Sequence, residues 1–199
     1  MKSAALALFL ISTAPLSIDA QRLTLPELAR LHAPEPLIQS RVGEFIAVPL
    51  EQSLPEADLV LHGTVQKATT YLSSDQMDIF TEYLIIPTRV IKQRLSIPTL
   101  TPGMQPAAPV VVKQWGGTMT IEGVEVSQVD HDTPNLTTQQ EVILLLSYNK
   151  TDKKYRIAPS GAFIVEQSKI VPLIQAPRLQ KYHGLTVSQF EIEVQRLSR

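Results

Sequence analysis

The sequence predicts a mainly β fold, in which a small closed β-barrel follows a short N-terminal helix and precedes a C-terminal amphipathic helix. Three observations lead to this prediction. Short apolar stretches with alternating polar residues follow one another across residues 54–167. The chain has 15 prolines, which favour loops and strand ends over long helices. Near the C-terminus, the apolar residues change to the spacing of a helix face.

The composition is that of one globular domain without thiol chemistry. Of 199 residues, 44% are hydrophobic and 19% are charged, which leaves enough apolar material for a sizeable core. The formal net charge is -1, so no global field attracts nucleic acid or an anionic membrane surface. The absence of cysteine excludes disulfides, thiol catalysis, iron–sulfur clusters and cysteine-bound zinc. We expect no cofactor.

Residues 1–20 are typical of a secretory signal peptide. Lys2 provides the positive start, Ala4–Ile11 the apolar run, and Ala20 the small residue at the expected cleavage point. The apolar run is too short to cross a bilayer, which takes about 20 apolar residues. We therefore expect a secreted or periplasmic protein that begins near Gln21 and has no integral membrane segment after cleavage. The alternative is a buried N-terminal helix.

A proline-rich lead-in is expected over residues 21–53. Thr24 is the expected N-cap of a short helix over residues 25–31, with Pro26 in its first turn, and residues 43–50 add a short strand. The full set of expected divisions is the signal peptide (1–20), the lead-in (21–53), the barrel domain (54–175) and a C-terminal helical segment (176–199).

The barrel domain contains a series of expected strands. Residues 142–148 form the most apolar run and are the best candidate for the central strand. Gly63 lies within the first strand, where glycine often marks a bulge, and Pro87 should bend the longest strand or place it at an edge. The strands are expected at 59–65, 79–91, 110–114, 119–129 as a hairpin turning at Gly123, 142–148, 155–157 and 162–165, with loops at 73–75 and 96–109 and a kink at Gly116-Gly117.

The C-terminal segment favours an amphipathic helix over residues 187–197. Thr186 is the expected N-cap, and Gln189 stands three residues later, at the spacing of a capping box. Phe190 and Val194 then fall on one helical face together with neighbouring apolar residues. Residues 191–194 also alternate, so a terminal strand is the competing interpretation.

Several segments resemble one known fold family. Glu56–Val65 is similar to the opening strand of the OB-fold domain shared by tissue inhibitors of metalloproteinases and netrin-like modules, and Phe80–Lys92 resembles its second strand. Exported bacterial proteins of unknown role have a similar arrangement. Their motifs are matched here by Gly116-Gly117, Pro134–Leu146 and Gly161-Ala162-Phe163.

The resemblance implies an OB-like barrel over residues 54–167, and a fold does not fix a function. Two positions depart from the bacterial motif: Gln140 replaces a glycine, and Leu145-Leu146 replaces a Phe-Leu pair. The metalloproteinase inhibitors chelate zinc through an N-terminal cysteine, and this chain has none. The resemblance therefore implies the scaffold without that mode of inhibition.

The densest cluster of possible metal ligands is Asp130-His131-Asp132. On a strand, the two carboxylates would face one way and the imidazole the other, whereas in a loop their oxygens could converge on a hard cation. The alternative is a solvated polar loop before Pro134. The other histidines are scattered, and none has a second histidine at helical spacing, so a zinc hydrolase is not supported.

Trp115 is the residue best suited to hold a partner. An indole at a strand end, beside two glycines, can anchor a protein or stack on a sugar ring. The alternative is a packed ring that plugs the barrel and bonds its N–H to the backbone. Lys153, Lys154 and Arg156 lie at a basic hairpin tip, which is either a solvated turn or a rim for an acidic partner.

We expect a non-catalytic binding module for a protein or glycan partner. The sequence does not indicate its oligomeric state. Nucleic acid is not expected, because residues 54–167 hold nine Lys or Arg against twelve Asp or Glu. No Gly-x-Ser-x-Gly motif or phosphate-binding glycine loop occurs. The alternatives are a structural or assembly component of a cell envelope and, less favoured, a hydrolase whose site is assembled from distant residues.

Overall fold

The structure, a computed structural model, describes residues 22–41, 47–94, 108–130 and 135–198. The predicted signal peptide and most of the expected loop at 96–109 lie outside these residues. The fold is mainly β, with a short N-terminal helix and a C-terminal helix, as the sequence predicts. The elements are α1 (Leu25–His32), β1 (Leu37–Arg41), α2 (Leu50–Glu56), β2 (Leu59–Leu72), β3 (Ile79–Gln93), β4 (Val110–Trp115), β5 (Gly117–Ile121), β6 (Val124–Asp130), β7 (Glu141–Asn149), β8 (Lys154–Glu166), β9 (Lys169–Pro172), the 3₁₀ helix η1 (Pro177–Tyr182) and α3 (Val187–Leu197).

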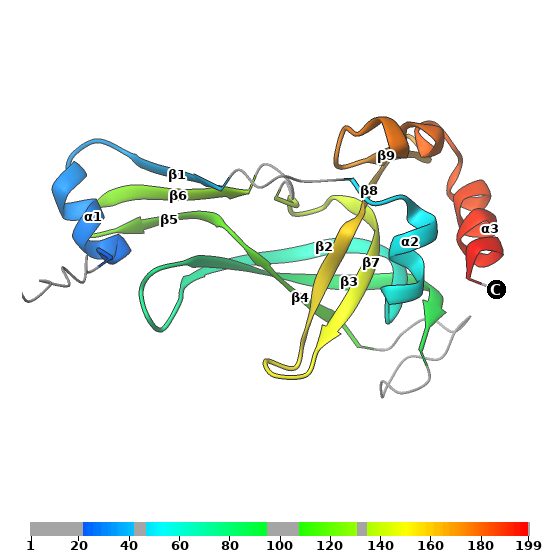
Figure 1. The fold of residues 1–199 in the computed structure, drawn as a ribbon, viewed down its shortest axis with the longest axis horizontal. Helices are drawn as coiled ribbons and strands as arrows, with labels where there is room; N and C mark the ends of the chain where they lie inside the picture. The colour runs from blue at the N-terminus through cyan, green and yellow to red at the C-terminus, as the bar shows by residue number, and fades with distance from the viewer. Residues whose placement is uncertain (1–21, 42–46, 95–107, 131–134, 199) are drawn as a thin grey trace, which may run out of the picture.

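The larger sheet closes into a ring of five strands (Figure 1). Its strands pair in the order β4-β3-β2-β7-β8-β9, with antiparallel neighbours throughout. A parallel bridge between Val112 and Tyr155 joins β4 to β8 and completes the ring, which leaves β9 outside it. The apolar run predicted as the central strand is β7, which lies between β2 and β8.

The two longest strands, β2 and β3, form a hairpin whose register is broken by bulges. One irregularity falls between His62 and Gly63, as the sequence predicts, and Gly63 lies opposite Pro87. A Cβ atom at Gly63 would stand 2.5 Å from the carbonyl oxygen of Ile86, so only glycine allows the two strands to approach this closely. The bend therefore depends on both residues.

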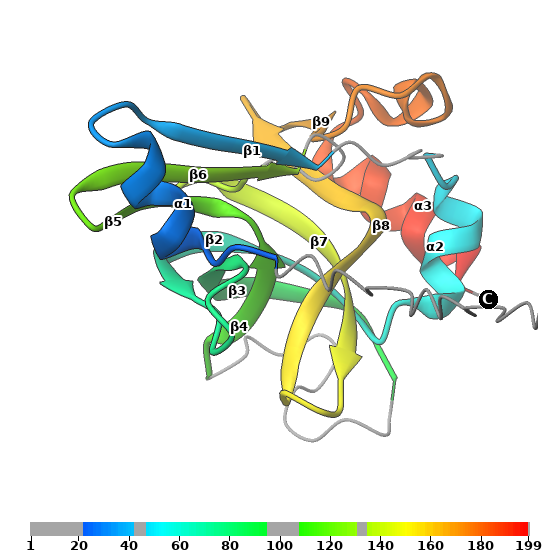
Figure 2. The same ribbon diagram turned by 60° about the vertical axis from the view of Figure 1, so that its left-hand side comes forward.

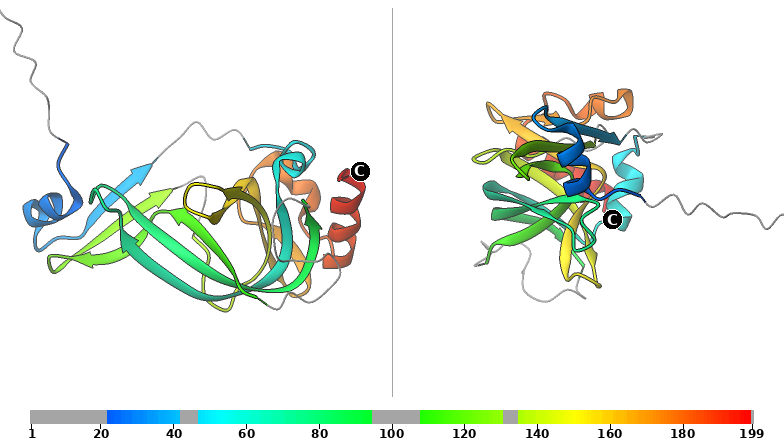
Figure 3. Two further views of the ribbon diagram at one scale, coloured as in Figure 1. Left: turned by 90° about the horizontal axis from the view of Figure 1, so that it is seen from below. Right: turned by 90° about the vertical axis from the view of Figure 1, so that its left-hand side faces the viewer.

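A second, three-stranded sheet lies at the end of the molecule opposite α3 (Figures 1 and 3). Its order is β1-β6-β5, in which β1 runs parallel and β5 antiparallel to β6. The β5–β6 hairpin is the one expected over residues 119–129, and α1 packs on this sheet (Figure 2). A turn of the chain after β4 thus carries it from the ring into a separate sheet.

The lead-in differs from its prediction. Part of the strand expected over residues 43–50 lies outside the described residues; residues 47–49 are irregular, and Leu50 begins α2. The expectation that residues 54–167 are β throughout is wrong at its start, because α2 extends to Glu56. Leu50 and Leu54 are four residues apart, so a helix places both on one face against the core. The sequence analysis also missed β1, β9 and η1.

Three apolar cores hold the elements together. One fills the ring and includes Leu61, Tyr83, Val112, Leu144 and Ala162. A second lies outside the ring under α2, η1 and α3, and a third joins α1 to the small sheet. No helix among the described residues is long and apolar enough to cross a membrane.

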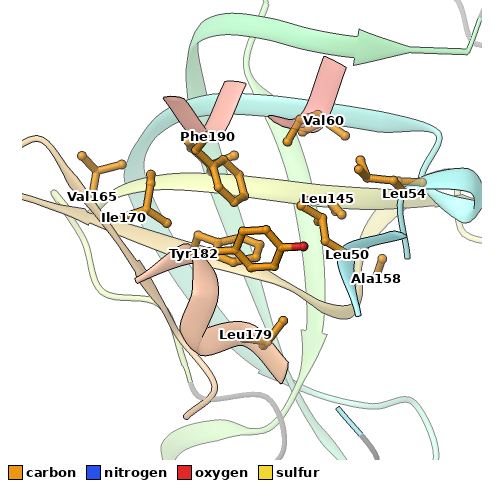
Figure 4. Packing of buried hydrophobic residues seen from close by; sticks show 14 of the residues in the cluster. Leu50, Leu54, Val60, Leu145, Ala158, Val165, Ile170, Leu179, Tyr182 and Phe190 are labelled. Atoms are coloured by element: carbon orange, nitrogen blue, oxygen red, sulfur yellow. The ribbon is translucent and has the colours of Figure 1, made fainter. Parts of the chain in front are cut away.

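Helix α3 confirms the amphipathic prediction, and the competing terminal strand is wrong. Thr186 Oγ1 accepts a hydrogen bond from the Gln189 backbone N–H at 3.3 Å, and the Gln189 side chain accepts one from the Thr186 N–H at 2.9 Å. Phe190 lies 4.7 Å from Phe163 and 5.7 Å from Tyr182, measured between ring centroids, within the core drawn in Figure 4. The three rings fix α3 to the ring of strands.

Phe190→Ala should lower the free energy of unfolding by about 3–5 kcal/mol, because it leaves a cavity between two rings. The matched control is Ile192→Ala on the same helix, where the side chain is 65% exposed. The control should change stability by less than about 0.5 kcal/mol. Urea unfolding followed by far-UV circular dichroism gives both values. Similar losses for the two variants would contradict the packing of α3 described above.

Candidate functional site

A cleft of about 790 Å³ opens where the small sheet meets the turn between β2 and β3. Apolar side chains from α1 line one wall. The last residues of β1, the β2–β3 turn, the end of β4 and one residue of β6 provide polar groups. The lining residues are Arg22, Leu23, Leu25, Leu28, Gln39, Ser40, Arg41, Met77, Asp78, Trp115 and Gln128. A mixed apolar and polar lining of this size suits a small ligand or a partner side chain.

Trp115 stands at this cleft, half-buried. Its indole N–H donates to Asp78 Oδ1 at 2.7 Å, and the Arg41 guanidinium lies 5.6 Å from its ring centroid. The alternative in which the ring bonds its N–H to the backbone is therefore wrong, since the acceptor is a carboxylate. The ring is held in one orientation by Asp78 and lines the cleft.

Two glycines set the position of Trp115. Gly116 and Gly117 have φ values of 98° and 137°, which L side chains rarely adopt, and they turn the chain from β4 into β5. The Gly116 N–H donates to the Ile79 carbonyl at 2.8 Å, and its carbonyl accepts from Thr81 Oγ1 at 2.7 Å. The predicted kink is therefore clamped onto β3, directly after the tryptophan.

Gln128 forms part of the cleft and joins the small sheet to the β2–β3 hairpin. Only 3% of its surface is exposed. Its amide oxygen accepts from the Ile79 N–H at 2.5 Å, and its amide nitrogen donates to Gln39 Oε1 at 2.8 Å and to the Met77 carbonyl at 3.2 Å. A buried amide satisfied on both sides rigidifies its surroundings, so this part of the cleft is preformed.

A row of aromatic side chains extends from Trp115 across the outer face of the five-strand ring. Cross-strand pairing places Tyr71 of β2 beside Phe80 of β3, and Phe80 beside Trp115 of β4. Lys113 Nζ lies 4.0 Å from the Phe80 centroid and 5.7 Å from the Tyr71 centroid. The row is consequently covered in part by a cation that stacks on it.

The basic residues predicted from the hairpin tip divide into two groups. Lys154 pairs with Glu82, and Arg156 Nη2 lies 3.0 Å from Asp152 Oδ2, so both belong to an ion-pair network beside the aromatic row. Lys153 is exposed in the turn itself, with a φ of 55°. Trp115, Arg156 and Asp130 line one small depression of about 140 Å³. The structure therefore brings Trp115 and Arg156 together and leaves Lys153 apart.

Tyr71, Glu82 and Asp152 of this network have shifted pKa values, and the first two lie closest to the aromatic row. Burial raises the pKa of Tyr71 above its ordinary value, and hydrogen bonding to Glu82 adds to the effect. Burial would also raise the pKa of Glu82, but hydrogen bonds from Lys154 and Tyr71 and the charge of Lys154 outweigh it. The pKa of Glu82 therefore lies below its ordinary value of 4.5.

The predicted metal cluster is only partly described. Asp130 ends β6 opposite Arg41, whereas His131 and Asp132 lie outside the described residues. Among the residues that the structure does describe, no group of three or more His, Asp or Glu side chains could hold a metal ion. The metal-binding hypothesis at residues 130–132 remains a prediction.

Sequence reasoning missed most of the cleft. Asp78 and Gln39 lie in a turn and in an unpredicted strand, and Gln128 resembles any polar residue of an alternating strand. The two glycines after Trp115 were the one local pattern that pointed to this position. No protein-family model matches the sequence, and no curated protein matches it either.

Gly117→Ala should cost about 2–3 kcal/mol of stability, because it combines backbone strain with a collision. The new Cβ would overlap Thr81 Oγ1 and come within 2.9 Å of Thr70 Cγ2. The control is Gly123→Ala, which also has positive φ but meets nothing within 4 Å, and it should cost about 1 kcal/mol. Thermal and urea unfolding would measure both, and equal losses would mean that the close packing at Gly117 is unimportant.

The network at Glu82 should make stability depend on pH. A carboxyl with a lowered pKa in the folded state contributes stability above its unfolded pKa and loses it as protons bind. The free energy of unfolding should therefore decline as pH falls below 4.5, the ordinary value for Glu82. Glu82→Gln and Lys154→Met each remove this contribution, so both should flatten the decline. Urea unfolding at a series of pH values measures this. If the free energy of unfolding of both variants declined with falling pH as steeply as that of the unmodified protein, the role assigned to this pair would be contradicted.

Proposed function

We propose that this chain is a non-catalytic binding module that holds a protein or glycan partner in the cleft beside Trp115. The observation that carries the proposal is an indole fixed by Asp78 at the wall of a cleft that also presents Arg41, Gln39 and Ser40. An oriented aromatic ring with a few convergent polar groups is the usual composition of a recognition site. Neither a nucleophile nor a general base is needed for this role.

Glycans and proteins both use such a surface. A tryptophan face stacks on the apolar face of a sugar, while guanidinium and amide groups bond its hydroxyls or carboxylates. On a protein partner, the same tryptophan would act as a central anchor surrounded by weaker contacts. The charge over residues 54–167, with nine basic against twelve acidic residues, disfavours nucleic acid.

We propose that the five-strand ring is an OB-like barrel of the kind found in tissue inhibitors of metalloproteinases and netrin-like modules. The order β4-β3-β2-β7-β8 and the parallel bridge back to β4 support this proposal. OB folds bind ligands on the face of their second and third strands and at the adjoining loops. The corresponding strands here are β3 and β4, whose outer face carries Phe80, Lys113 and Trp115.

The proposed setting is secreted or periplasmic, on the basis of the signal-peptide pattern in residues 1–20. A structural or assembly role in a cell envelope remains the alternative, since it would need a protein-binding surface of the same kind. A hydrolase is the less favoured alternative.

Trp115 is the only tryptophan of the chain, so its fluorescence reports on the proposed site directly. Printed glycan arrays and affinity capture from secreted material would first supply a ligand, and titration would then shift the Trp115 emission. Trp115→Ala should weaken binding by at least about 2 kcal/mol, roughly thirtyfold in Kd, as measured by calorimetry, because this variant has no tryptophan emission. Ile192→Ala, far along α3, is the matched control and should bind normally. Ligands bound equally well by Trp115→Ala would refute the assignment of the site.

A further inference from the structure

Strand β1 forms one border of the small sheet (Figure 1). Among the described strands, β6 is its only hydrogen-bonding partner. The backbone N–H and C=O groups along the other edge of such a strand are a template on which another strand can pair. This edge lies on the side of β1 away from β6, whereas side chains of the same strand, among them Gln39 and Arg41, line the cleft.

Strand β1 has few of the features by which proteins block such edges. It is short and follows Pro36, but between Leu37 and Arg41 it contains no proline and no lysine, and its sole charge is at the last residue. Ile38 is 67% exposed. The residues aligned with Ile38 across the sheet are Ser127 and Thr118, so this isoleucine is an isolated apolar group on a polar face. A second apolar side chain from a partner strand would cover it.

We propose that β1 pairs antiparallel with β1 of a second copy of this chain, about a two-fold axis at Ile38. In a symmetric antiparallel pair, each residue must meet one whose side chain lies on the same face of the sheet. Centring on Ile38 brings the two Ile38 side chains together and sets Pro36 opposite Ser40. Glu35, in the bend just before β1, then lies beside Arg41 of the other copy. Centring on Gln39 would instead set Arg41 opposite Leu37 and leave the charges without partners.

Charge complementarity therefore selects both the occupant and the register. Glu35 and Arg41 are both exposed, and among the described residues no ion pair occupies either of them. Opposite charges directly across an antiparallel pair are favourable, and the two-fold axis forms this pair twice. The short pairing predicts a weak dimer, with an interface below the size of a stable complex.

The axis runs perpendicular to the sheet, so both copies present the same face. Gln39 and Arg41 alternate with Ile38 and line the cleft, and the two clefts would open on one side of a continuous six-stranded sheet. If the proposed function holds, the dimer is a bivalent binder, and a repetitive partner would be held with higher avidity than by one cleft. The pairing itself does not rest on that function.

The chain has no cysteine, so single cysteines can test the register. Ile38→Cys should form an intermolecular disulfide on mild oxidation, because directly opposite Cα atoms lie about 4.5–5.5 Å apart. The matched control is Ser40→Cys on the same face of the same strand. Its counterpart would lie four residues away along the strands, about 13 Å, beyond the reach of a disulfide. Non-reducing gels at equal protein concentration compare the two rates.

Charge reversal tests the same register without a covalent bond. Glu35→Arg and Arg41→Glu should each weaken dimerisation roughly tenfold, and the double variant should restore it. Sedimentation velocity over a wide concentration range measures the association, and circular dichroism verifies folding. Equal cross-linking of both cysteine variants would overturn the proposal. So would a monomer at every concentration, or a double variant no better than the single reversals. Dimerisation that persists in Trp115→Ala would separate this result from the fate of the proposed function.

Discussion

The β2–β3 hairpin is the element on which the rest of the structure depends, because β3 contributes side chains to all three cores. Ile79 packs with α1 and the small sheet, Tyr83 and Ile85 fill the ring, and Ile91 packs against the core under α3. One strand can do this only if it curves, and the bulge at Gly63 opposite Pro87 allows the curve. Strand β2 also reaches all three cores, so in the absence of disulfides the hairpin as a whole helps to keep the ring, the small sheet and α3 in one arrangement.

The outer face beside the cleft is stabilised by side chains that also suit it for recognition. Lys113 has a side chain only 17% exposed, stacked on Phe80 and 3.9 Å from Asp152. Exposed ion pairs contribute little to stability, but a cation that is partly desolvated over an aromatic ring contributes more. The network therefore holds the aromatic row in a fixed geometry, which reduces the entropy that a partner must overcome on binding.

Sequence periodicity was enough to predict elements whose environment is decided locally. The alternation of the β5–β6 hairpin, the apolar run of β7 and the capping box of α3 each carry their own pattern, and the structure confirms all three. Strand β1 and helix α2 were missed because their few apolar residues gain a core only from distant partners such as Val126 and Phe163. The cleft was missed for the same reason. A turn aspartate and a strand glutamine become a site only when the small sheet folds back onto the β2–β3 hairpin.

The position of the cleft connects the two proposals physically. Strand β1 contributes Gln39 and Arg41 to the cleft wall, while its opposite edge is the one proposed to pair with a second copy. Pairing at that edge would order the backbone that holds Arg41 over the Trp115 ring. A ligand in the cleft would order the same five residues from the other side. Thermodynamic reciprocity then requires the two effects to be equal. If dimerisation raises the affinity for the ligand by some factor, ligand binding raises the dimer association constant by the same factor.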